Sequence, residues 1–187
     1  KYLMYKNVYW HKTTRCATAM IKKALLCALR DGVLRNEDLY VLDDEQFFAL
    51  PQTLDFEPLE LFSQVRNNAL LSCRFEEPFD SGRNLDKICT SLDGRMQAEE
   101  QLFRNLQAKH GYGNLKNHEV IIDIPEPIFF ESDILLIKED DSEIPFNQYD
   151  TLFTQDVGRV FTKSLRKTRI FTPSYVSRQA VYEALEF

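Results

Sequence analysis

The spacing of hydrophobic and polar residues is most regular at the start of the chain. Small or apolar side chains recur every three or four positions, at Tyr5, Tyr9, Thr13, Cys16, Met20, Ala24 and Cys27. This spacing places them on one face of an α-helix, so we predict a single helix from Lys1 to Arg30 that ends at Gly32. No capping residue precedes it, and we interpret the uncapped start as the mark of a chain cut from a longer protein.

Helical spacing of apolar residues continues as far as residue 112. We expect a short helix over 45–50, capped by Asp43 or Asp44 and stopped by Pro51. A longer helix is predicted to begin near Asp55, with a buried face that extends to Cys73. Two more helices follow over 84–92 and 96–106, separated at Asp93-Gly94 and ended by Gly111 and Gly113.

Short β-branched segments appear only after residue 112. The sequence predicts strands over 119–124, 133–138 and 169–171, a helix over 155–165, and a last helix capped by Ser174. The expected fold class is therefore α+β and mainly α-helical. It comprises a long N-terminal helix within a helical lobe at 1–112 and a smaller, β-containing α+β lobe at 113–187.

The amino-acid composition and net charge indicate which classes of protein fit this chain. The 187 residues contain 44% hydrophobic and 28% charged side chains, which is typical of one soluble domain. The net charge of −6 argues against a protein that coats nucleic acid. No apolar run is long enough for a membrane span, and the N-terminal residues do not resemble a secretory signal. We expect a cytoplasmic protein whose four cysteines, Cys16, Cys27, Cys73 and Cys89, are buried free thiols within helical patterns.

The segment Tyr5 to Lys12, YKNVYWHK, resembles the helix that directly follows the catalytic core in HD-superfamily phosphohydrolases. The closest likeness is to the branch that hydrolyses deoxynucleoside triphosphates. Segments 41–44, 120–137 and 161–171 continue the resemblance in the same order. It implies the C-terminal half of a metal-dependent enzyme in which a metal-activated water attacks phosphorus.

The family's metal site is missing from this sequence. HD enzymes bind metal through a His…His-Asp…Asp set, but none of His11, His110 and His118 is followed by aspartate. We therefore expect no cofactor and no catalytic residue in this chain, a divalent metal in the intact enzyme, and no activity from the chain alone. The expected partners are an upstream HD catalytic core, a nucleotide substrate or effector, and further copies of the chain. No membrane and no specific nucleic acid are expected.

The resemblance and the residue types together nominate Tyr5, Tyr9, His11 and Lys12 as substrate-binding residues. The two tyrosines lie one helical turn apart and offer an aromatic wall for a sugar or base. Lys12, with Lys1, Lys6 and Arg15, offers positive charge for a triphosphate. The alternative is that the tyrosines are core aromatics, His11 a helix-surface histidine and Lys12 part of a solvated face.

Two further charged clusters have competing interpretations. Asp43, Asp44 and Glu45 are best explained as helix-N-terminal acids, with metal binding as the alternative. The basic residues of 163–169 either bind an effector nucleotide or face water. For the chain as a whole, the alternative to a phosphohydrolase portion is a non-catalytic regulatory or protein-interaction domain. In that case the Tyr-Trp-His-Lys helix would pack against a partner.

Overall fold

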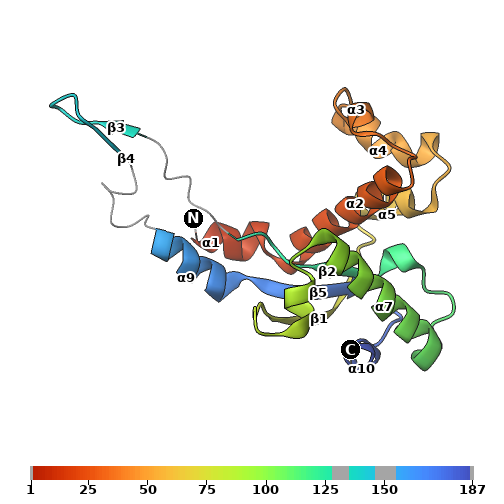
Figure 1. The fold of residues 1–187 in the computed structure, drawn as a ribbon. Helices are drawn as coiled ribbons and strands as arrows, with labels where there is room; N and C mark the ends of the chain where they lie inside the picture. The colour runs from red at the N-terminus through yellow and green to blue at the C-terminus, as the bar shows by residue number, and fades with distance from the viewer. Residues whose placement is uncertain (1, 128–134, 146–154, 186–187) are drawn as a thin grey trace.

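A three-stranded antiparallel sheet lies at the centre of the fold (Figure 1). The computed structural model describes residues 2–127, 135–145 and 155–185. The strands are β1 (Ser72–Pro78), β5 (Lys167–Thr172) and β2 (Ile121–Asp123), in the order β1-β5-β2. The middle strand comes from near the C-terminal end of the chain, so the sheet joins segments that are far apart in sequence.

Both faces of this sheet are buried. Ile121 and its register partner Phe171 pack against α2 (Lys12–Arg30), α4 (Asp44–Thr53) and α5 (Glu60–Arg66). The next pair, Ile122 and Ile170, belongs to a second core with α7 (Leu92–His110) and α10 (Arg178–Ala184). Successive side chains of a strand point to opposite faces. A strand covered on both faces therefore reads as a continuous apolar run, as Val120 to Ile122 does.

The prediction of one continuous helix from Lys1 to Arg30 is wrong at its beginning. A short α1 (Tyr2–Met4) leads into a π-helical turn, η1 (Tyr5–Tyr9), and α2 starts only at Lys12. Between them His11 is extended, and its Nδ1 accepts a hydrogen bond from the Thr13 amide at 3.4 Å. The break turns Trp10 inward against Leu165, so that Trp10 is only 7% exposed. Within α2 the expected buried face and the stop at Gly32, with φ of 71°, are confirmed.

The helix predicted from Asp55 to Cys73 is shorter than expected. A 3-10 turn, η2 (Glu57–Leu59), precedes α5, which ends at Arg66, and residues 72–78 form β1 instead. Residues 72–78 form a strand because they pair with β5, and this long-range pairing overrides the local helical pattern. Pro51 does not stop α4 either. The helix continues to Thr53, and the Leu54 amide still donates to the Leu50 carbonyl at 3.0 Å.

Two boundaries in the second half also differ from prediction. The helices α6 (Asn84–Ile88) and α7 separate at Ser91, which caps α7, and Gly94 lies inside α7. A Cβ at Gly94 would lie 2.2 Å from the Ile88 carbonyl oxygen, so this close turn requires glycine. Gly111, with φ of 72°, ends α7 as predicted. Ser177 caps α10, not Ser174.

The remaining elements are short. They are α3 (Asn36–Leu39), the 3-10 turn η3 (Asn117–Glu119), the hairpin of β3 (Leu135–Ile137) and β4 (Glu143–Pro145), and α9 (Gln155–Leu165). The helix predicted over 155–165 is confirmed, and β2 and β3 confirm the core of two predicted strands. Residues 133 and 134 of the strand predicted over 133–138 lie outside the described residues.

The fold class is confirmed as mainly α-helical with small antiparallel sheets. The division into lobes at residue 112 stays a prediction, and the pairing of β1 with β5 connects the two parts across it. In the described ranges, no helix combines the length and the apolar character needed to cross a membrane.

The four cysteines are free thiols, as predicted. Cys16, Cys27 and Cys89 are buried on helices or helix ends, whereas Cys73 is half-buried on β1 and not on a helix. Burial raises the pKa of the Cys16 and Cys89 thiols to about 12. These thiols are therefore protonated at neutral pH and poorly nucleophilic.

His118 makes the stability of this fold pH-dependent. Burial lowers the pKa of His118, and its Nε2 has no hydrogen-bond partner among the described residues. Below about pH 6.5 the unfolded chain binds a proton that the folded chain excludes, so stability falls as the pH drops towards the lower folded pKa. We expect urea unfolding to show a lower free energy of unfolding at pH 5.5 than at pH 7.5. His118→Leu should weaken this dependence, and an identical dependence in that variant would contradict the assignment.

Candidate functional site

The residues before α2 form a small aromatic group. The rings of Tyr5 and Tyr9 lie 5.3 Å apart, and those of Tyr5 and Trp10 lie 5.7 Å apart in an edge-to-face arrangement. Tyr5 is half-buried and Trp10 is buried, whereas Tyr9 is 52% exposed. Tyr5 therefore packs within the folded chain, whereas the ring of Tyr9 is accessible to a ligand or a partner.

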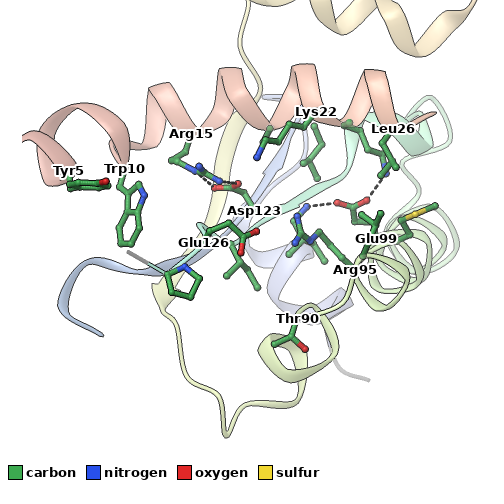
Figure 2. Close-up of a pocket in the computed structure, with 18 residues that line it drawn as sticks. Tyr5, Trp10, Arg15, Lys22, Leu26, Thr90, Arg95, Glu99, Asp123 and Glu126 are labelled. Atoms are coloured by element: carbon green, nitrogen blue, oxygen red, sulfur yellow. Dashed lines mark hydrogen bonds and ion pairs between the residues drawn. The ribbon is translucent and has the colours of Figure 1, made fainter. Parts of the chain in front are cut away.

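A cavity of about 750 Å³ opens beside this aromatic group (Figure 2). We call it the α2 groove, because α2 forms one wall, while β2 and the beginning of α7 form the others. Tyr5 and Trp10 close one end, and Thr90 lies on the turn before α7. Its volume is in the range of small-molecule binding sites.

An ion pair spans the groove between α2 and β2. Arg15 donates to both carboxylate oxygens of Asp123, with Nε to Oδ2 at 2.9 Å, and Figure 2 shows the two side chains pointing toward one another. Their side chains are only 13% and 5% exposed. A bidentate pair of this kind fixes both side chains in orientation as well as in position.

A second buried pair lies further along α2. Lys23 Nζ lies 2.5 Å from Glu99 Oε2, and Glu99 Oε1 accepts the Ile122 amide at 2.8 Å. Glu99 therefore connects α2, α7 and β2 through one carboxylate. Because both charges are buried, removal of either partner would leave the other charge unpaired and lower the stability of the fold.

Charged residues also form a row across the sheet on its α2 side. Register places Glu76, Arg169 and Asp123 opposite one another on the three strands. Arg169 Nε donates to Glu76 Oε2 at 2.7 Å, and its Nη2 donates to the Trp10 carbonyl at 3.1 Å. Arg169 therefore stabilises the break between η1 and α2 that positions the aromatic group.

The basic run at 163–169 does not form one solvated face or one effector site. Arg169 is buried in the row just described. Arg166 stacks on Phe79, with its guanidinium carbon 3.8 Å from the ring centroid, and donates to the Pro125 carbonyl at 2.7 Å. Lys167 Nζ pairs with Glu76 at 2.6 Å. Three of the four cations thus have structural partners within the chain.

The four nominated substrate-binding residues do not gather around one cavity. Tyr5 lines the α2 groove, and Lys12 lines a second cavity of about 640 Å³ between α2 and β1. Tyr9 and His11 are exposed and line neither of these two cavities, and His11 serves as the cap of α2. Their role in substrate binding remains a prediction.

The described residues do not fit a metal ion. Across residues 2–127, 135–145 and 155–185, no three His, Cys, Asp or Glu side chains are grouped so that they could hold one. Asp43, the first residue of the acidic cluster, caps α4 by accepting from the Gln46 amide at 2.8 Å. Helix capping thus accounts for this cluster, as expected.

The charged walls of the groove were not predicted from the sequence. Lys23 lies three residues after Met20 and four before Cys27, at the spacing of the apolar face of α2. Asp123 interrupts the apolar run of β2. A lone charge inside an apolar pattern is the available signal, because such residues are buried only with a partner.

Comparison with known proteins gives the family. None of the curated proteins matches this chain. A solved phosphohydrolase from Bacteroides thetaiotaomicron VPI-5482 is similar over 91% of this chain and 47% of its own, with 18% identity and a TM-score of 0.43. The chain thus spans about half the length of that protein. A family model described as an HD associated region matches residues 1–155, and the chain belongs to this family of HD-associated regions.

Proposed function

We propose that this chain is the non-metal portion of an HD-type phosphohydrolase that acts on nucleotides, specifically deoxynucleoside triphosphates. The observation that carries the proposal is the match of residues 1–155 to the HD associated region. The substrate is inferred from the likeness of Tyr5 to Lys12 to the helix that follows the HD core. This interpretation assigns the metal and its chemistry to an HD core, and the binding of substrate partly to this chain.

The exposed apolar residues near the beginning of the chain support the proposal that another part of the enzyme covers them. Leu3, Met4, Val8 and Tyr9 are 66%, 48%, 42% and 52% exposed. We call these four residues the N-terminal strip. Contiguous apolar exposure of this kind commonly marks an interaction surface. In the proposal an HD core covers the strip, and Tyr9 then lies at the boundary between the two parts.

Within such a pocket the chain's own residues bind and orient the nucleotide. Tyr9 supplies an apolar face for the sugar and a hydroxyl for one hydrogen bond. Lys12 is exposed on the first turn of α2 and supplies positive charge for phosphate. Because the described residues do not fit a metal, the chain without an HD core is expected to release no triphosphate from deoxynucleoside triphosphates.

The Tyr9 hydroxyl offers a test in the protein that carries both an HD core and this chain. Tyr9→Phe should lower kcat/KM for metal-dependent triphosphate release from dATP roughly 2- to 12-fold, the loss of one neutral hydrogen bond. Its Tm should hardly change, because Tyr9 is half-exposed and contributes little buried area. Tyr40→Phe is the matched control, since Tyr40 is 85% exposed directly after α3, which lies far from α1 in Figure 1.

Equal kinetic constants in folded Tyr9→Phe and wild-type protein would remove Tyr9 from the pocket. A similar loss in Tyr40→Phe would show that the effect is not local. Failure of the wild-type protein to hydrolyse any deoxynucleoside triphosphate would remove the proposed substrate.

The N-terminal strip also supports a second candidate, a non-catalytic interaction domain. In that case the strip binds another protein or a second copy of the chain, and nucleotide plays no part. Tyr9→Ala would then weaken self-association in sedimentation experiments without any change in nucleotide hydrolysis. The first proposal instead predicts that Tyr9→Ala lowers nucleotide hydrolysis and leaves self-association unchanged.

A further inference from the structure

The α2 groove contains more positively charged side chains than its two buried ion pairs neutralise. Four cations line it, and two of them are neutralised by the buried pairs Arg15–Asp123 and Lys23–Glu99. The remaining two are Lys22 on α2 and Arg95 on α7. Neither makes an ion pair with another residue in the described parts of the chain. In a chain of net charge −6, this is a local excess of positive charge.

Arg95 is the less satisfied of the two. Its Nε is buried and has no hydrogen-bond partner among the residues that the structure describes. Buried donors of charged groups are normally paired, and leaving one unpaired costs free energy. A ligand anion in the groove would supply the missing acceptor. Lys22 is exposed on the facing helix and would supply a second, mobile contact.

A third acid, Glu126, lines the groove in addition to Asp123 and Glu99, and its charge must be counted. It is exposed. Burial lowers the pKa of the Arg166 guanidinium, and the nearby charge of Glu126 opposes that shift. Its charge is therefore partly balanced by Arg166 and screened by water. The unpaired cations lie on α2 and α7, whereas Glu126 lies past the end of β2.

The other end of the groove is aromatic. Tyr5 and Trp10 line it, and Figure 2 shows Lys22 further along α2, beyond Arg15. An aromatic surface at one end and unpaired cations further along the groove match an elongated ligand with a flat organic part and an anionic tail. The two buried ion pairs hold the intervening walls in place, so the site is largely pre-formed.

From this arrangement we infer that the α2 groove binds a phosphate-bearing ligand, with its phosphates on Arg95 and Lys22 and any base or sugar towards Tyr5. This site is distinct from the proposed pocket of the Tyr9 side chain. The phosphate assignment does not depend on hydrolysis, and only the choice of dATP as a probe rests on the proposed function.

Titration calorimetry with inorganic triphosphate and with dATP, in EDTA to prevent metal-dependent hydrolysis, tests this inference. Lys22→Ala and Arg95→Ala should each weaken binding by about tenfold or more, the loss of one charge-assisted hydrogen bond. Arg104→Ala is the matched control, because Arg104 lies on the same helix, is exposed and pairs with Glu100. Its affinity should equal that of wild type. Lys22 is exposed, so Lys22→Ala provides a variant whose folding is not at risk.

The only tryptophan of the chain, Trp10, reports which part of the ligand is recognised. Tighter binding of dATP than of triphosphate, with a change in Trp10 fluorescence, would support a nucleotide ligand. Equal binding without a fluorescence change would support recognition of the phosphates alone. Absence of binding by both probes, or equal affinity in wild type, Lys22→Ala and Arg95→Ala, would overturn the inference. Binding without hydrolysis, in the presence of metal, by the protein that carries both an HD core and this chain would contradict the proposed function and leave this site intact.

Discussion

Glu99→Leu is expected to lower the free energy of unfolding by about 3–5 kcal/mol, the cost of leaving one member of a buried ion pair without its partner. Glu99 is 3% exposed and accepts from both Lys23 Nζ and the Ile122 amide. The substitution leaves a buried ammonium and a buried amide without acceptors. Urea unfolding followed by Trp10 fluorescence measures the loss.

The double variant Lys23→Met, Glu99→Leu separates the two contributions. It removes the stranded charge and leaves only the Ile122 amide unpaired, so about 1–3 kcal/mol of destabilisation should remain. Glu100→Leu, on the neighbouring position of α7, is the control, because its pair with Arg104 is largely exposed. A double variant less stable than Glu99→Leu would contradict the account of a buried pair.

Arg169→Met is expected to lower the free energy of unfolding by about 2–4 kcal/mol, because two hydrogen bonds of a buried guanidinium are lost. The Trp10 carbonyl loses its donor at 3.1 Å, and Glu76 keeps only Lys167 as partner. Without Arg169 the break between η1 and α2 is less well fixed. Trp10 should then become more exposed, so its emission should shift to longer wavelength in the folded protein.

Lys167→Met provides the control for this prediction. Lys167 lies on the same strand and pairs with the same Glu76 carboxylate, yet has no bond to Trp10. Its pair is partly exposed and should contribute about 1 kcal/mol or less. Equal emission spectra for Arg169→Met and Lys167→Met would show that Arg169 does not position the aromatic group.

Local patterns predicted the elements whose signals are contained within a few turns. The buried face of α2, the cap at Asp43 and the end of α7 at Gly111 follow from side-chain spacing and from residues suited to helix ends. The strand β2 follows from its β-branched run. These features depend on neighbours in sequence, which is why a single sequence reveals them.

Features that depend on distant partners were predicted wrongly or not at all. The pairing of β1 with β5 places the predicted end of a helix, Ser72 and Cys73, at the start of a strand. The inward turn of Trp10 depends on Leu165 and Arg169, more than 150 residues away in sequence. The same limit applies to the α2 groove, whose charged walls come from α2, α7 and β2. The family resemblance nominated Tyr5 as a substrate-binding residue, which stays a prediction although Tyr5 lines the groove, and it did not indicate Arg95 or Lys22.

The central claim is that this chain forms part of a nucleotide-hydrolysing pocket together with an HD core. The most direct test compares metal-dependent triphosphate release from dATP by three samples: this chain, an HD core of the family, and the two joined in one protein. The account predicts no release by this chain, and a kcat/KM for the joined protein well above that of the core alone. Equal kcat/KM values for the core and the joined protein, or release by this chain alone, would contradict it.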